Sequence, residues 1–279
     1  VYKRNATGSS LVSFLKKVGS SRDFALPWAL AQADTTAFFN DLACVYRGEE
    51  AAFGSLDTVR FDVNFTQLPI LAELALSYRC NNACLFCYAG CAGGCSRATS
   101  SRPELDTAAF KEIITVFARE ARVPFFSFTG GEPCLREDLE ELVAHGRGEG
   151  LITNLVTNGT LIDPSRARSL KSAGLGSAQV SIEAPDARLH DLLVGREGAF
   201  EETLAGISSL LGAGIPTQTN TTICALNRSP VTAMPSLLKE LGLRRFAMNL
   251  FIPTIPGPHT DSLFLPYEEI GPIVEAVRE

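Results

Sequence analysis

Residues 80–87 read Cys80-Asn81-Asn82-Ala83-Cys84-Leu85-Phe86-Cys87, and they follow an apolar stretch, Ile70–Leu76, that is typical of a buried strand. Three thiolates in one short loop can bind three corners of a cubane iron–sulfur cluster and leave the fourth iron open. Structural zinc, the alternative, usually takes four nitrogen or sulfur ligands in paired C-x-x-C spacing. The chain has no second C-x-x-C and only three histidines, all distant in sequence. The spacing therefore favours a cluster, and a zinc-stabilised binding module stays the alternative.

The sequence beyond this loop alternates regularly between strand and helix patterns. Strands are expected over residues 70–76, 123–128, 152–156, 178–182, 216–223 and 245–251. Helices are expected over residues 106–121, with Asp106 as N-cap, and over 137–145, 164–173, 200–213 and 231–241, with a last helix from about 267. Crossovers of this length predict parallel pairing. The pattern predicts an α/β fold, a partial (β/α)6 TIM-type barrel over residues 68–279, with its chemistry at the carboxyl ends of the strands.

The first 60 residues have a different pattern. Apolar residues over 11–18 and 28–46 have helical spacing, which predicts a small, mainly helical or winged-helix-like module over residues 1–60. The chain begins with Val1 and stops at Glu279 inside an expected helix. We therefore expect the sequence to be a piece of a longer protein.

Composition excludes several classes of function. A net charge of −6 argues against a nucleic-acid-binding protein, which usually carries a basic patch. No run of eighteen apolar residues occurs, so no membrane-spanning helix is expected. Of eight cysteines, five fall within sixteen residues. Such clustering in a long chain favours ligation in a reducing compartment over a disulfide scaffold, and we expect a cytoplasmic location.

Two motifs together resemble the radical S-adenosylmethionine (SAM) superfamily: the C-x-x-x-C-x-x-C loop with Phe86 before its third cysteine, and the second strand ending in Gly130-Gly131-Glu132-Pro133. The resemblance implies that Cys80, Cys84 and Cys87 bind a [4Fe–4S] cluster whose open iron is chelated by the amino and carboxylate groups of SAM. It also implies that the methionine amino group is held by Gly130, Gly131, Glu132 and Pro133, with the Glu132 carboxylate and backbone carbonyls as acceptors, and that Phe86 packs near the adenine. Glycine would let the backbone approach the ligand closely.

Further positions match the same family less specifically. Asn158, in a Thr-Asn-Gly turn, is implied to line the pocket, although it could equally be a plain left-handed turn residue. Ser181 and Glu183 end the fourth strand, where polar groups need partners; SAM ribose and carboxylate are expected, with Ser181 favoured and a structural role open for Glu183. The family often has an arginine that binds the SAM carboxylate at the position where this chain has Val194. Arg196 or Arg188 could substitute, and a surface salt bridge is the alternative for either.

The resemblance implies a radical enzyme, supplied with electrons by a flavodoxin- or ferredoxin-like donor under anaerobic conditions. The Gly-Gly-Glu-Pro form and the stretch His190–Phe200 resemble the branch with a cysteine-rich (SPASM or twitch) extension, which includes peptide maturases, sulfatase maturases and haem-pathway enzymes. The segments 5–8 and 38–42 resemble a precursor-peptide-binding domain, so peptide modification is the leading expectation.

Two alternatives remain beside the zinc module: a radical SAM enzyme acting on a small molecule, such as a tetrapyrrole or a cofactor precursor, and a non-catalytic iron–sulfur electron carrier. A carrier would not need the SAM-pocket residues, and this counts against it. Cys91, Cys95 and Cys134 could bind an auxiliary cluster, but three convergent ligands are not apparent, so free or packing thiols are favoured.

Overall fold

The computed structural model describes residues 2–4, 40, 41, 44, 56–58, 69–87, 89, 104–253 and 259–278. The chain divides into two compact units, Val1–Gln67 and Leu68–Glu279. In the first unit, β1 (Tyr2–Arg4) and β2 (Leu56–Thr58) pair antiparallel. The helix expected over residues 11–18 and most of that over 28–46 lie outside the described residues, as do the segments 5–8 and 38–39.

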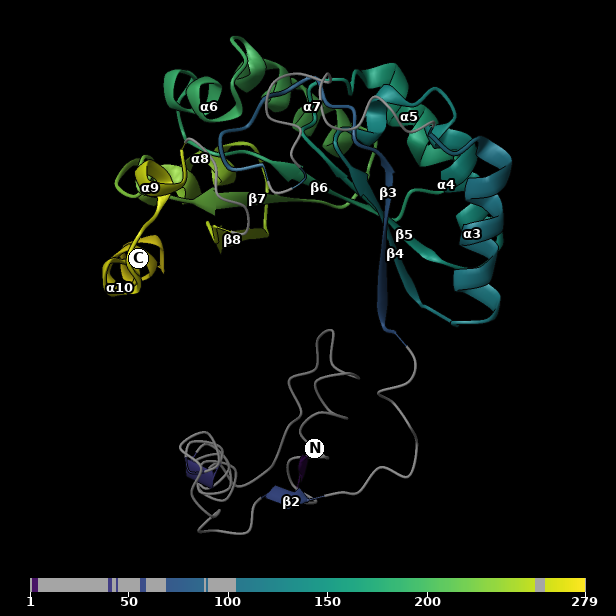
Figure 1. The fold of residues 1–279 in the computed structure, drawn as a ribbon, viewed down its shortest axis with the longest axis horizontal. Helices are drawn as coiled ribbons and strands as arrows, with labels where there is room; N and C mark the ends of the chain where they lie inside the picture. The colour runs from purple at the N-terminus through teal and green to yellow at the C-terminus, as the bar shows by residue number, and fades with distance from the viewer. Residues whose placement is uncertain are drawn as a thin grey trace, which may run out of the picture. The chain divides into compact units, whose positions relative to one another are not determined.

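A six-stranded parallel sheet organises the second unit (Figure 1). Its order is sequential: β3 (Leu71–Ser77), β4 (Phe125–Gly130), β5 (Ile152–Thr157), β6 (Ser177–Ser181), β7 (Thr217–Ile223) and β8 (Phe246–Leu250). All five neighbouring pairs are parallel. In the described part of the chain β3 and β8 form the two edges, so the sheet stays open. This architecture confirms the predicted partial barrel.

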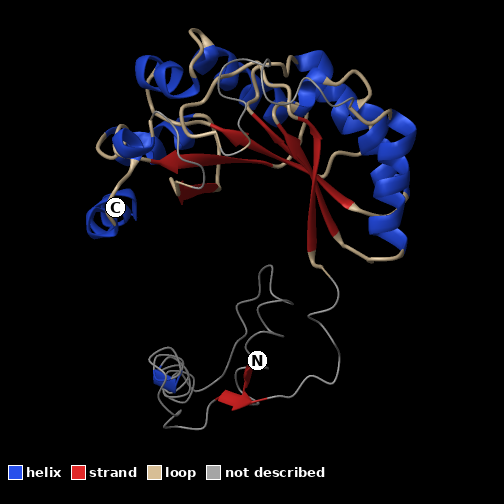
Figure 2. Ribbon diagram, in the orientation of Figure 1, coloured by secondary structure: helices blue, strands red, loops and turns tan. Residues whose placement is uncertain are grey.

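Helices cover the outer face of this sheet (Figure 2). They are α3 (Thr107–Arg119), α4 (Leu139–Gly148), α5 (Pro164–Ser172), α6 (Ala187–Val194), α7 (Ala199–Gly212), α8 (Met234–Glu240), α9 (Thr260–Leu263) and α10 (Ile270–Arg278), with short 3-10 turns η2 (Pro133–Leu135), η3 (Pro230–Ala233) and η4 (Tyr267–Glu269). The Asp106 carboxylate accepts a hydrogen bond from Ala109 N at 2.8 Å, as expected of the N-cap of α3. The sequence did not predict α6, although Asp186 caps it in the same way.

The core lies between the sheet and these helices. Phe126, Phe128 and Leu155 point outward from β4 and β5 and are fully buried, together with Ile114 of α3 and Leu142 of α4. Burial of this apolar layer is the main driving force that holds the helices on the sheet. The opposite, inner face carries many polar side chains, and several of these line the candidate site.

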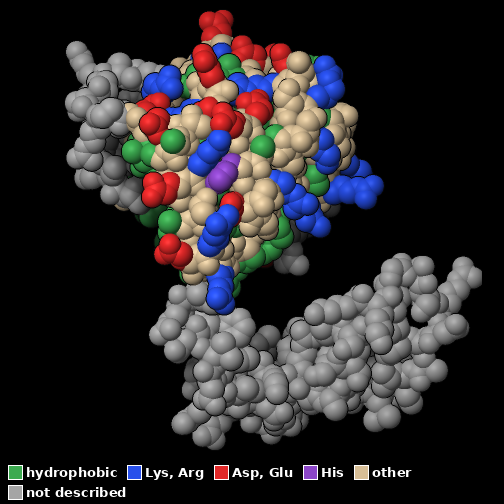
Figure 3. All heavy atoms as spheres, turned by 90° about the vertical axis from the view of Figure 1, so that its right-hand side faces the viewer, with side chains coloured by type: hydrophobic (Ala, Val, Ile, Leu, Met, Phe, Trp, Pro, Cys, Tyr) green, Lys and Arg blue, Asp and Glu red, His purple; other side chains and the backbone are tan. Residues whose placement is uncertain are grey.

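The exposed side of α3 and α4 shows acidic and basic side chains interspersed (Figure 3). Two ion pairs, Lys111–Glu141 and Arg119–Glu149, cross between the helices, the second at 2.7 Å. Of the helices in the described part of the chain, none combines the length and the apolar character needed to span a bilayer.

Candidate functional site

A cavity of about 440 Å³ opens at the carboxyl ends of the strands and is lined by residues from all six strands and from the cysteine loop. Most of the residues singled out from the sequence line it: Cys80, Cys84, Cys87, Phe86, Gly130, Gly131, Asn158, Ser181 and Glu183. Glu132, Pro133 and Arg196 are not among its lining residues.

The cysteine loop is docked on the end of helix α6. Ala83 N donates to Val194 O at 2.8 Å and Leu85 N donates to Leu193 O at 2.9 Å. The last carbonyls of a helix have no partner within it, so these bonds satisfy both segments. Gly195, with a φ of +66°, ends the helix, and a Cβ at this position would lie 2.6 Å from Ala83 O. The close contact therefore requires glycine here.

The segment that precedes the cysteine loop, residues 77–79, is hydrogen-bonded to the turn after β4. Gly131 N donates to Ser77 O at 2.7 Å, and Glu132 N donates to Arg79 O at 2.8 Å. A Cβ at Gly130 or Gly131 would lie 2.2 Å from the carbonyl oxygen of Ser77 or Arg79, respectively. The glycines therefore permit a close approach to the chain just before Cys80, and not only to a ligand as the sequence suggested.

Glu132 is fully buried beneath this turn. Its carboxylate accepts from Cys134 N at 2.9 Å, Thr157 Oγ1 at 2.8 Å and Asn158 N at 2.8 Å. Burial raises the pKa of this carboxyl, and the hydrogen bonds oppose the rise. The carboxylate thus joins the ends of β4 and β5, whereas the sequence predicted that it would face the methionine amino group. Pro133 begins η2 and is buried.

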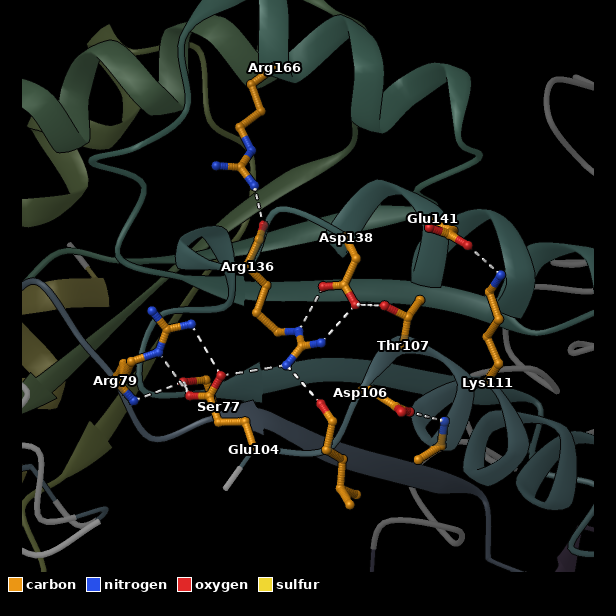
Figure 4. A network of polar contacts seen from close by, with 12 residues as sticks. Ser77, Arg79, Glu104, Asp106, Thr107, Lys111, Arg136, Asp138, Glu141 and Arg166 are labelled. Atoms are coloured by element: carbon orange, nitrogen blue, oxygen red, sulfur yellow. Dashed lines mark hydrogen bonds and ion pairs between the residues drawn. The ribbon is translucent and has the colours of Figure 1, made fainter. Parts of the chain in front are cut away.

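A polar network supports the same turn from behind (Figure 4). Arg136 binds both carboxylate oxygens of Asp138, at 2.8 and 2.7 Å, and lies 4.7 Å above the ring of Phe110. This guanidinium lowers the pKa of Asp138. Arg166 of α5 donates to the backbone oxygens of Cys134 and Arg136. The turn after β4 is therefore fixed from two helices.

Asn158 connects strand β5 to the cysteine loop. Its Nδ2 donates to Asn81 Oδ1 at 2.8 Å and lies 4.0 Å from Cys80 Sγ, while its Oδ1 accepts from Thr160 N at 3.0 Å. The left-handed residue of this turn is Gly159, with a φ of +79°. The alternative reading of Asn158 as a plain left-handed turn residue is therefore wrong.

The end of β6 places two polar groups at the cavity. The Ser181 hydroxyl makes no hydrogen bond to a described residue and is free to bind a ligand. Glu183 is buried, and its Oε2 accepts from Thr222 N at 2.7 Å. Burial raises the pKa of Glu183 to about 8. Its own N–H donates to Nδ1 of His190 at 3.1 Å, which fixes the backbone there.

Arg196 does not reach the cavity. Its Nε donates to Asn82 Oδ1 at 2.9 Å, and the guanidinium pairs with Glu202. Val194 lines the cavity, and Arg188 is exposed. The geometry therefore matches the ion-pair alternative for Arg196, with the addition of a bond to the cysteine loop.

The three loop cysteines have the chemistry of cluster ligands, and all three line one cavity. Their thiols face one cavity, and the pKa of Cys84 is raised by burial, with further contributions from Glu183 and the other two cysteines. No three Cys, His, Asp or Glu side chains in the described part of the chain lie close enough to surround a single ion. A cubane cluster does not need that closeness, because each thiolate binds a different iron. Cys134 is buried near Thr157, and Cys91 and Cys95 lie outside the described residues, so an auxiliary cluster stays a prediction.

Several lining residues were missed from the sequence: Glu73, Asn82, Gln179, Asn220, Thr222 and Asn249. Most of them lie on strands, where they share the inner face. The sequence Thr-Gln-Thr-Asn-Thr-Thr-Ile of β7 is polar at every position except the last, and a strand this polar was the available signal.

Comparisons with known proteins agree with this geometry. The family model of the radical SAM superfamily matches residues 74–233. An AdoMet-dependent heme synthase of Methanosarcina barkeri is 35% identical over 201 residues, 72% of this chain and 56% of that protein. A PqqA peptide cyclase of Methylocella silvestris is 37% identical over 176 residues, 63% of this chain and 45% of that protein. The chain thus spans about half the length of these curated relatives.

The fold also matches solved structures. Streptococcus suis SuiB bound to S-adenosylmethionine superposes with a TM-score of 0.62 at 17% identity, covering 97% of this chain and 57% of SuiB. The matched family model spans more than half of the chain and includes the three cysteines, the Gly-Gly-Glu-Pro turn and the end of β6. This protein therefore belongs to the radical SAM superfamily.

Proposed function

We propose that Cys80, Cys84 and Cys87 hold a [4Fe–4S] cluster, that SAM binds in the adjoining cavity, and that the resulting radical modifies a peptide. When bound, the cluster and SAM supply reductive cleavage to methionine and a 5′-deoxyadenosyl radical, which removes a hydrogen atom from the substrate. The observation that carries this proposal is the shared cavity of the three thiols, the Gly-Gly turn and the free Ser181 hydroxyl.

The remaining side chains bind and orient SAM. In this proposal the backbone of Gly130 and Gly131 accepts from the methionine amino group, while Ser181 and Glu183 bind polar groups of SAM. Phe86 and Phe251 both line the cavity and both pack against the apolar cluster that contains Leu193, which provides an apolar surface for the adenine. We assign Glu132 to holding the turn, because its three hydrogen bonds engage both carboxylate oxygens.

The charge of the cavity favours a peptide over a polycarboxylate. Among the described residues that line it there is no Lys or Arg, while Glu73 and Glu183 contribute carboxyl groups. A tetrapyrrole bearing several carboxylates would enter without a cationic partner, and an unpaired charge is costly to bury. The PqqA peptide cyclase relative supports the peptide reading. A small-molecule substrate is the second candidate, because the heme synthase relative matches more of the chain.

Other parts of the proposal rest on the sequence. From the family resemblance we propose a flavodoxin- or ferredoxin-like electron donor, and from the clustered cysteines we propose a cytoplasmic location. Residues 1–60 are proposed to bind the precursor peptide.

The test is an anaerobic assay of reconstituted protein with SAM and dithionite, in which 5′-deoxyadenosine is quantified. Cys84→Ala should abolish the product. Cys224→Ala is the matched control, because Cys224 is a buried thiol that packs with Leu193 and does not line the cavity; it should retain the product. Absence of 5′-deoxyadenosine from wild-type protein with a full cluster would refute SAM cleavage and favour the electron carrier.

A further inference from the structure

Two pairs of carboxamide side chains lie on the inner face of strands β6, β7 and β8. Gln218 Nε2 donates to Gln179 Oε1 at 3.2 Å, and Asn249 Nδ2 donates to Asn220 Oδ1 at 2.9 Å. Gln179, Asn220 and Asn249 line the same cavity as the cysteines. Interiors of TIM barrels are usually filled by branched apolar side chains. A polar inner face therefore indicates a bound ligand with matching polar groups.

The pairing leaves defined groups unused. A carboxamide has two N–H donors and one carbonyl acceptor. In each pair one N–H group donates to one oxygen. In the first pair the nitrogen of Gln179 and the oxygen of Gln218 then make no hydrogen bond to a described residue, and in the second pair the same holds for the nitrogen of Asn220 and the oxygen of Asn249. Each pair can thus still donate one hydrogen bond and accept another. A peptide group, with one C=O and one N–H, needs both.

The spacing of the two pairs also matches a peptide. Gln218 and Asn220 lie two residues apart on β7, so their side chains point to the same face about 6.6 Å apart. An extended peptide repeats its backbone groups at the same interval of about 6.6 Å for two residues. Gln179 is the register partner of Gln218, so one pair lies directly across two neighbouring strands.

We propose that the pairs Gln179–Gln218 and Asn220–Asn249 bind alternate backbone amide groups, about 6.6 Å apart, of an extended substrate peptide. Ser181 lies two residues beyond Gln179 on β6 and is the register partner of Asn220. The Asn220–Asn249 pair therefore lies level with the SAM-binding end, and the Gln179–Gln218 pair lies nearer the amino ends of the strands. The inference rests on the proposed function and specifies how its substrate is held: through the backbone, and so with tolerance for side chains.

A fifth carboxamide on this face, that of Asn154, provides an internal control. Asn154 Nδ2 donates to Ser127 Oγ at 3.2 Å, and its Oδ1 accepts from Ser177 Oγ at 2.8 Å. Both ends of this amide are engaged, and Asn154 does not line the cavity. It therefore has the same chemistry on the same sheet without the proposed role.

The experiment measures retention of peptides by mass spectrometry after affinity selection on the reconstituted protein with SAM. One probe is a pool of random synthetic octapeptides with blocked ends, and the other is the same pool with methylated backbone nitrogens. Wild type should retain the unmethylated pool at least tenfold better. Gln218→Met with Asn249→Leu removes the two free oxygens that would accept from peptide N–H groups and should remove this preference, whereas Asn154→Leu should keep it. Urea midpoints establish that each variant is folded.

Several outcomes would overturn the inference: equal retention of both pools, no retention of either by wild type, an unchanged preference in the double variant, or its loss in Asn154→Leu. The 5′-deoxyadenosine formed from SAM without peptide is measured on the same samples. Missing 5′-deoxyadenosine with a preserved peptide preference refutes the proposed function alone. Normal 5′-deoxyadenosine without a peptide preference refutes this inference alone.

Discussion

Replacing Gly195 with alanine tests whether the end of helix α6 holds the cysteine loop in position. Gly198 provides a matched control three residues later. Both glycines have positive φ values, +66° and +77°. A Cβ at Gly195 would lie 2.6 Å from Ala83 O, whereas a Cβ at Gly198 would meet nothing within 4 Å. The two substitutions therefore share the backbone strain and differ in the contact with the loop.

The expected magnitudes follow from this difference. Alanine in the left-handed region costs about 1–2 kcal/mol at either position. At Gly195 the loop must also move away, which weakens the bonds from Ala83 N and Leu85 N to the end of α6. Each such bond contributes about 0.5–1.5 kcal/mol net. We expect Gly195→Ala to be less stable than Gly198→Ala by about 1–3 kcal/mol. For each 1.4 kcal/mol lost, the state in which the cysteine loop is bound to α6 should be about tenfold less populated.

Anaerobic urea unfolding of the cluster-free proteins measures the difference in the free energy of unfolding. Iron content and visible absorbance after reconstitution then report whether the loop still holds a cluster. Gly195→Ala should lose cluster content, and Gly198→Ala should retain it. Equal stability and equal iron in the two variants would refute the idea that α6 positions the cysteines.

Three further predictions concern stability. Burial lowers the pKa of His190 from 6.5 to about 4. Because the pKa is lower in the folded state, the neutral imidazole contributes to the free energy of unfolding above pH 6.5, and this contribution of about 3 kcal/mol is lost as the pH falls to 4. The difference in the free energy of unfolding between wild type and His190→Gln should shrink by this amount between pH 7 and pH 4, and a constant difference would contradict the shift. Gly206→Ala should lower the free energy of unfolding by about 3 kcal/mol, because its Cβ would lie 2.0 Å from Gly159 O. Gly212→Ala in the same helix has nothing within 4 Å and should raise it by about 0.5–1 kcal/mol. Thermal unfolding compares the two variants, and equal midpoints would count against the close packing of Gly206. Glu132→Gln turns its NH2 group either toward Asn158 N or toward Cys134 N and Thr157 Oγ1, which leaves at least one buried donor without an acceptor. The substitution should cost about 1–3 kcal/mol in urea unfolding, and a neutral result would argue against its bracing role.

Much of the fold could be predicted because its signals are local. Asp106 caps α3 as expected, and each predicted strand in the barrel lies within a few residues of an observed one. Helix α6 was missed although Asp186 and Gly195 mark its two ends. It has only eight residues, so its helical periodicity is weak, and the same residues resemble a family motif.

The site was only partly predictable because its geometry depends on distant residues. The three cysteines could be identified from their spacing alone. The orientation of Glu132 depends on Asn158, and the position of Arg196 depends on Asn82, far along the chain. Sequence patterns place such residues near the site but do not determine which partner a side chain chooses.

The bond between Arg196 and Asn82 joins residues 114 positions apart, and it has a consequence for synthesis of the protein. A ribosome adds about 5–20 residues per second, so roughly 6 to 23 s pass between the emergence of the cysteine loop and that of its anchor. During this interval the thiols have emerged without the α6 contacts that position them. Insertion of a cluster into the finished geometry must therefore follow translation of Arg196, and the order of these two events is set by the chain itself.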